Sequence, residues 1–198
     1  MGISARQFEE MEQRVRGRKS AAQKNADRVS STHEILLGVD PSLRGTGYGL
    51  VKLSGDPPEV LGHGTIKCPA KWNRSECLVA ITRTLREVVQ KHQPTVCAIE
   101  GLFYSQNVKT ALIMGEARGA ALAAVAEGGL EIYEIAPRKV KQSIVGYGNA
   151  QKIAVAKMVQ RMLQLKNLPE SDAADALALA LTYAHLNKRF VIDPAQKI

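Results

Sequence analysis

The chain has 198 residues, 45% of them hydrophobic, and a formal net charge of +8 with a sequence pI of about 9.5. This composition excludes an intrinsically disordered chain, and the charge favours a polyanionic partner, nucleic acid first and an anionic membrane surface second. The three cysteines form no CxxC pair and no apolar stretch is long enough to span a membrane, so we expect a protein of the reducing cytoplasm without a membrane partner.

The two ends of the chain differ in amino-acid composition from its middle. Residues 1–33 carry seven Lys and Arg against four Asp and Glu and few large apolar residues, which predicts a basic, disordered N-terminal extension. This extension is either a solvated arm or a basic arm that contacts the DNA backbone; its four acids disfavour a mitochondrial transit peptide. Residues 34–187 are predicted to form the folded domain, and 188–198 a C-terminal tail.

Hydrophobic periodicity predicts five strands and five helices in the folded part. The first strand, "EILLGVD", is a continuous apolar run, as is typical of a buried central strand. The expected strands are 34–40, 46–53, 59–68, 95–100 and 130–135, and the expected helices are 76–92, 105–129, 137–146, 149–165 and 171–186. Three strands followed by helices that alternate with two more strands predict an α/β layer fold with a mixed sheet.

Four carboxylates stand at positions where binding sites form. Asp40 and Glu100 each close a buried strand, and sites in such sheets lie beyond the carboxyl ends of the strands. Asp172 and Asp175 share one face of a helix that is apolar nearly all round. Four clustered carboxylates repel one another, and a hard divalent cation such as Mg²⁺ or Mn²⁺ is the simplest compensation. On a basic protein this combination points to phosphodiester hydrolysis assisted by two metal ions.

Structural roles for the same residues remain open at this point. The sequence Asp40-Pro41-Ser42 is also a turn start, and "SDAAD" is also a helix start with Ser171 or Asp172 as N-cap. The glycine-rich "GTGYG" at 45–49 is not a dinucleotide loop, because a strand continues where a helix would have to open. Its glycines are better explained as a place where the strand passes close to other backbone or to nucleic acid.

Four segments in this order resemble one known family. "GVDPSLRGTGYGLV", "AIEGLFYSQNVKTALIMGEARGAALAA", "KQSIVGYGNAQK" and "DAADALALA" are together similar to the RuvC-type Holliday junction resolvases, the crossover junction endodeoxyribonucleases, over about residues 35–186. The resemblance implies a ribonuclease H-like fold, with a mixed five-stranded sheet and helices packed on both faces. It also implies a homodimer and paired, symmetric, Mg²⁺-dependent nicking of four-way DNA junctions in recombination and repair. Asp40, Glu100, Asp172 and Asp175 fall on the four acidic positions of the family.

The resemblance also assigns DNA-binding positions. Phe103, followed by Tyr104, falls on the aromatic that meets junction bases, although Phe103 also fits a core position. Lys141 and Lys152 fall on phosphate-holding positions around the "VGYGNA" loop, although both also fit ordinary solvated lysines. The Ala- and Gly-rich helix 110–126 is either the dimer contact or a buried core helix. Two Mg²⁺ per active site, with Mn²⁺ as a substitute, and a branch-migration helicase partner complete these expectations.

Three other functions fit parts of this sequence. An actin-like or sugar-kinase phosphotransferase also pairs a strand-end aspartate with a Gly/Thr turn, but this chain is short for two such lobes. A ribonuclease H-like nuclease acting on RNA differs in substrate only. A non-catalytic junction-binding protein is disfavoured because all four acids are present.

Overall fold

The computed structural model of the chain describes residues 33–101, 107–188 and 196–198. Residues 33–198 form one compact unit, which contains the domain predicted at 34–187. The predicted extension 1–33, except for its last residue, lies outside the described residues, as do Phe103, Tyr104 and most of the predicted tail. In the described part of the chain, no helix has the length and apolar character that crossing a membrane requires.

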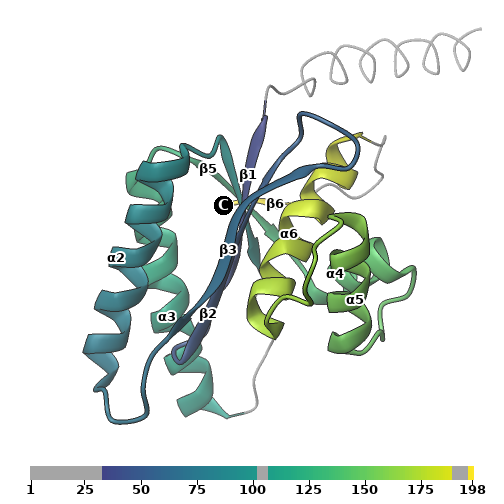
Figure 1. Cartoon of the computed structure of the whole chain (residues 1–198). Helices are drawn as coiled ribbons and strands as arrows, with labels where there is room; N and C mark the ends of the chain where they lie inside the picture. Colours follow the sequence, from purple (N-terminus) through teal and green to yellow (C-terminus); the bar gives the residue numbers. More distant parts are fainter. Residues whose placement is uncertain (1–32, 102–106, 189–195) are drawn as a thin grey trace, which may run out of the picture. The chain divides into compact units, whose positions relative to one another are not determined.

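A single mixed sheet forms the centre of the unit, with the strand order β3-β2-β1-β4-β5-β6 (Figure 1). The strands are β1 Ile35–Asp40, β2 Gly45–Lys52, β3 Glu59–Lys67, β4 Val96–Glu100, β5 Glu131–Ile135 and β6 Gln196–Lys197. β1 pairs with β4 and β4 with β5 in parallel, and the other neighbouring pairs are antiparallel. The predicted five-stranded mixed sheet is confirmed. The two-residue β6 adds an edge strand inside the predicted tail, where a segment so short carries no periodicity.

Helices cover both faces of the sheet, as predicted. α2 Arg74–His92 and α3 Val108–Glu127 lie on one face, and α4 Pro137–Val145, α5 Lys152–Met162 and α6 Ser171–Lys188 on the other (Figure 1). α3 begins later than its sequence pattern suggested because Asn107 caps it, its side chain accepting a hydrogen bond from the Thr110 backbone N–H at 3.1 Å.

Alternation along the central strands separates two hydrophobic cores. Leu37 and Val39 of β1 pack with α2 and α3, whereas Leu36 packs with α6 and its neighbours. In β4, Ile99 belongs to the first core and Ala98 to the second. Asp40 follows Val39 and Glu100 follows Ile99. Because successive side chains of a strand point to opposite faces, both acids point to the α6 side of the sheet.

Candidate active site

Asp40 and Glu100 lie side by side at the carboxyl ends of two neighbouring parallel strands. Val39 is paired with Ile99, so the next residue of each strand lies at the same level. A hydrogen bond joins the two carboxyl groups. The strand-end acids predicted from sequence thus meet, as expected for the carboxyl edge of a parallel strand pair.

The start of α6 lies over this edge because the sheet carries glycines beneath it. A Cβ atom on Gly47 would lie 1.9 Å from the Asp172 backbone oxygen, and one on Gly38 only 1.8 Å from that of Ala176. No residue with a side chain fits at either position without moving the helix. The prediction that the "GTGYG" glycines permit close approach of other backbone is confirmed, and the approaching backbone is that of α6.

The structure does not place Asp172 at the N-cap of α6. The Glu170 backbone oxygen accepts the hydrogen bond from Ala174 N–H at 2.8 Å, so the helix begins at Ser171 and Asp172 lies inside its first turn. A negative charge in the first turn still interacts favourably with the helix dipole. Neither Asp172 nor Asp175 therefore stands at the N-cap position of this apolar helix.

The acids shift one another's proton affinity. Burial, with the charges of Glu100 and Asp175 and the hydrogen bond to Glu100, raises the pKa of Asp40 to about 8. Burial and the charge of Asp175 likewise raise the pKa of Glu100, against the opposing hydrogen bond to Asp40 and the charges of Lys152 and Lys141. Without a cation, this pair therefore retains a proton at neutral pH.

Lys152 supplies a positive charge at this cluster. Its Nζ donates to Asp175 Oδ2 at 2.7 Å, while 66% of its side chain remains exposed. Burial acts to lower the pKa of Lys152, but the hydrogen bond to Asp175 and the charges of Asp175, Asp40 and Asp172 raise it overall. The cluster thus already attracts one cation, an ammonium group, to Asp175.

Not all four predicted acids occupy equivalent places. The charge of Asp175 acts on both Asp40 and Glu100. The charge of Asp172 acts on Lys152, and Asp172 lies beside Gly45, where an added Cβ would be 2.7 Å from its Oδ2. Within the described ranges, no three His, Cys, Asp or Glu side chains are already arranged to hold a metal ion. The all-carboxylate donor set nevertheless fits hard divalent cations. Lys152 occupies Oδ2 of Asp175, so a metal ion bound through that oxygen would displace the ammonium group.

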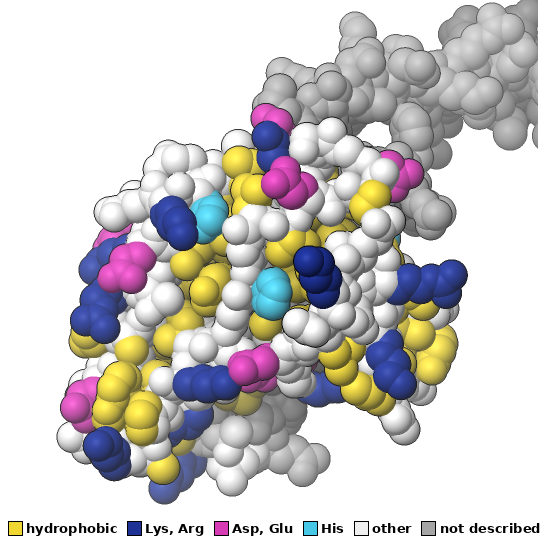
Figure 2. All heavy atoms as spheres, viewed as in Figure 1, with side chains coloured by type: hydrophobic (Ala, Val, Ile, Leu, Met, Phe, Trp, Pro, Cys, Tyr) yellow, Lys and Arg dark blue, Asp and Glu magenta, His cyan; other side chains and the backbone are white. Residues whose placement is uncertain are grey.

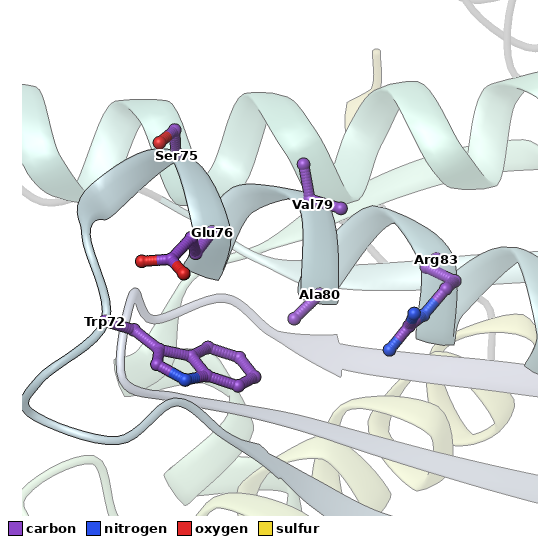
Figure 3. A pocket seen from close by; sticks show the side chains of 6 residues that line it. All are labelled: Trp72, Ser75, Glu76, Val79, Ala80 and Arg83. Atoms are coloured by element: carbon purple, nitrogen blue, oxygen red, sulfur yellow. The ribbon is translucent and has the colours of Figure 1, made fainter.

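Two surface hollows lie outside the acidic cluster. One, of about 430 Å³, runs along the start of α2, where the indole of Trp72 lies below the helix and Arg83 lies further along it (Figure 3). The other, of about 300 Å³, lies between β3 and the start of α6 and is bordered by Lys67 and Glu170, which form an ion pair at 2.7 Å. None of the four predicted acids lines either hollow.

The basic residues do not form one continuous stripe on the side that Figure 2 shows. Lys and Arg side chains are spread over several parts of this face, with acidic side chains between them. The net charge of +8 therefore agrees with a polyanionic partner without marking one binding surface here.

Comparison with known proteins gives one consistent family. The family model described as crossover junction endodeoxyribonuclease RuvC matches residues 36–183. The RuvC protein of Akkermansia muciniphila is 44% identical over 148 residues, which cover 75% of this chain and 89% of its own length. That of Haemophilus influenzae is 42% identical over 151 residues, 76% of this chain and 79% of its own length.

Solved structures agree with these sequence relatives. The structure of Thermus thermophilus RuvC in complex with Holliday junction substrate superposes with a TM-score of 0.74 at 32% identity, covering 84% of this chain and all of that one. The yeast mitochondrial Holliday junction resolvase, at 12% identity and a TM-score of 0.52, shares the fold alone; it matches 79% of this chain and 86% of its own. The predicted ribonuclease H-like fold is confirmed.

Proposed function

This chain belongs to the RuvC family of crossover junction endodeoxyribonucleases, and we propose that Asp40, Glu100, Asp172 and Asp175 form its active site. As a member of that family it is a metal-dependent endonuclease that resolves four-way (Holliday) junctions in recombination and repair. One observation carries the proposed site: Asp40 and Glu100 lie level on neighbouring strands, with Asp175 near enough to raise the pKa of both.

We infer that the metal is Mg²⁺, two ions per site with Mn²⁺ as a substitute, held by these four carboxylates. Hard oxygen donors without nitrogen or sulfur ligands favour these ions. The chemistry that bound divalent cations supply is Lewis-acid activation of the scissile phosphodiester. Before ligation, Asp40 and Glu100 must release the proton that their raised pKa values retain.

The two lysines are proposed to act on the DNA backbone. When Asp175 exchanges Lys152 for a metal ion, the exposed ammonium becomes available to donate to a phosphate oxygen of the bound strand. Lys141 acts on Glu100 through its charge and is proposed as a second phosphate contact. Phe103 and Tyr104 are proposed to contact junction bases; that assignment depends on the family resemblance, because both lie outside the described residues.

We propose that α3 forms a homodimer contact. On its outer surface Val108 is 71% and Leu112 62% exposed, and a Cβ on Gly115 or Gly119 would meet nothing within 4 Å. Exposed apolar side chains beside open glycines suit the close packing of a second helix. A two-fold dimer would present two active sites to two opposed strands, which explains paired symmetric nicks. A branch-migration helicase partner and a cytoplasmic location are proposals that rest on the family.

The test offers a labelled four-way DNA junction, a DNA duplex, a flap and a four-way RNA junction to the full chain with Mg²⁺, and maps the nicks. We expect paired nicks at equivalent positions in the DNA junction alone. Asp172→Asn and Asp175→Asn should abolish nicking while junction binding in Ca²⁺ survives, and exposed Asp56→Asn should change neither. Normal nicking by both site variants, or cleavage of RNA in preference to DNA, would count against the proposal.

A further inference from the structure

Arg118 is a buried charged residue of the Ala- and Gly-rich helix α3. It lies in the "GEARG" segment of α3 and is only 5% exposed. Its guanidinium reaches the sheet, where Nη1 donates to the backbone oxygen of Glu100 and Nη2 donates to Glu134 Oε2. A buried guanidinium is costly unless its donors are satisfied, so these two acceptors hold Arg118 in a fixed orientation.

These contacts meet where β4 ends. Gly101 N–H donates to the Ile135 oxygen of β5 at 2.9 Å, as the last bond of that ladder. A Cβ on Gly101 would lie 3.1 Å from Glu134 Oε1, so the Glu134 carboxylate packs directly against the Gly101 backbone. The peptide group between Glu100 and Gly101 is thus held at both ends: its N–H by Ile135 of β5, and its carbonyl oxygen by Arg118.

This restraint opposes a specific force. The carboxyl group of Glu100 is hydrogen-bonded to that of Asp40 and lies in the field of Asp175, whose like charge acts against this placement of Glu100. Strand ends open more easily than strand centres. The pairs Arg74–Glu116 and Arg86–Glu127 also involve α3, but they join it to α2 on the surface and contact no residue of the acidic cluster.

We propose that Arg118 is a positioning residue for the nuclease reaction: paired with Glu134, it fixes the Glu100 peptide so that the Glu100 carboxylate stays beside Asp40. The inference rests on the proposed function, because it assumes that Glu100 is an active-site acid. Arg118 acts through Glu100 and does not itself contact DNA or metal.

The test compares Arg118→Lys and Glu134→Gln with the matched surface variants Arg86→Lys and Glu127→Gln. Lysine keeps the charge but cannot reach two acceptors as a guanidinium fork does. We expect Arg118→Lys to lower the nicking rate of saturating junction 10- to 100-fold and to raise the Mg²⁺ concentration for half-maximal rate severalfold. Junction affinity in Ca²⁺ should stay within twofold of wild type, and the surface variants should resemble wild type in every assay.

A second readout needs neither metal nor DNA. In EDTA, hydrogen exchange of the Gly101 amide should be at least tenfold faster in Arg118→Lys and Glu134→Gln than in wild type, because the restraint on its peptide is weakened. Wild-type nicking by Arg118→Lys together with a lower melting temperature would overturn the proposal, as would unchanged Gly101 exchange. Glu100→Gln distinguishes failure of the proposed active site from failure of the positioning role of Arg118. If Glu100→Gln nicks normally, the proposed active site fails; if it is inactive while Arg118→Lys is normal, only the positioning role fails.

Discussion

Glu100 and Glu134 stand on neighbouring strands at the same edge of the sheet, and the protein treats them in opposite ways. Glu134 is paired with the buried guanidinium of Arg118. Glu100 faces two other acids, Asp40 and Asp175, and its pKa is raised. Glu134 is compensated by a buried cation, whereas the pair of Glu100 and Asp40 is compensated by a retained proton and by the charges of Lys152 and Lys141. A carboxylate cluster compensated by an exchangeable proton and by an exposed ammonium group is prepared for a metal cation.

Arg118 and Lys152, the cations that pair with these acids, also differ in how firmly they are held. Arg118 is buried and held by two acceptors from different strands, whereas Lys152 is exposed and joined to Asp175 by one hydrogen bond. A fixed guanidinium suits a permanent contact, and a long ammonium side chain with one contact suits a contact that is exchanged. The carboxyl edge of the sheet thus combines a permanent contact, of Arg118 with β4 and β5, and an exchangeable contact, of Lys152 with Asp175 of α6.

The largest expected effect comes from removing the carboxylate beside Glu100. Asp40→Asn should lower junction nicking by about three orders of magnitude, the scale of losing ~4 kcal/mol of transition-state stabilisation. Junction affinity in Ca²⁺ should change little, because phosphate contacts to basic residues supply most of it. Nicking and filter binding on the same junction test this. Exposed Glu59→Gln is the control, and a binding defect equal to the nicking defect would contradict the prediction.

The next effect tests whether the position of α6 matters as much as its charges. Gly47→Ala puts a Cβ within 1.9 Å of the Asp172 backbone and must displace the start of the helix. We expect a stability loss of about 1–3 kcal/mol from overpacking and a nicking loss of roughly 100-fold, the cost of misplacing reacting groups by about 1 Å.

Gly55→Ala is the control for this prediction, because its Cβ would meet only the Pro57 oxygen, at an ordinary 3.5 Å. Urea unfolding and nicking at a temperature well below the melting point separate the two losses. A Gly47→Ala protein with wild-type nicking would show that α6 can move without harm to the site.

A smaller effect concerns pH and stability without metal. The pKa of Asp40 is about 8 in the folded chain, against its usual value of 3.8. Between these values the folded state binds a proton that the unfolded chain has released, so the stability of the metal-free protein should fall as pH rises from about 4 to about 8. Urea unfolding in EDTA at pH 5, 6.5 and 8 measures this slope.

Asp40→Asn should have a shallower slope than wild type and should be the more stable protein at pH 8. Mg²⁺ should stabilise wild type more at pH 8 than at pH 6, because it replaces the proton and binds only the native arrangement. Parallel slopes for the two proteins would contradict the raised pKa.

Three of the four proposed acids stand out in the sequence because each breaks a local rule, whereas Asp40, which opens Asp-Pro-Ser, also fits an ordinary turn. Glu100 ends a buried strand, where glutamate is depleted, and Asp172 and Asp175 interrupt an apolar helix. The sequence could not predict that Asp175 would lie near Asp40 and Glu100 while Asp172 lies beside Gly45, because the i, i+3 spacing only places both aspartates on one helix face. This difference arises from the close packing of α6 on Gly45 and Gly47, which depends on three-dimensional placement.

The acid partners of the two cations were also beyond the sequence, although the family resemblance marks Lys152 itself as a site residue. Lys152 is 23 residues before Asp175, and Arg118 is 16 residues before Glu134, so neither pair has the spacing of a helical or hairpin contact. One signal was present: an arginine within the Ala- and Gly-rich run "GEARGAALAAVAE" has to find acceptors when that helix is buried. Its two acceptors follow only from the β4–β5 register.

The smallest effects should come from the lysines, and they distinguish a phosphate contact from an exchangeable partner of Asp175. Lys141→Gln and Lys152→Gln should each weaken junction binding severalfold and reduce the salt dependence of log K by about one unit. Lys152→Gln should also lower nicking at low Mg²⁺ more than Lys141→Gln, because Asp175 loses the partner that moderates repulsion with Asp40 and Glu100 before metal binds. Higher Mg²⁺ should narrow that difference. Exposed Lys166→Gln is the control, and identical Mg²⁺ titrations for the Lys141 and Lys152 variants would show that Lys152 serves only as a phosphate contact.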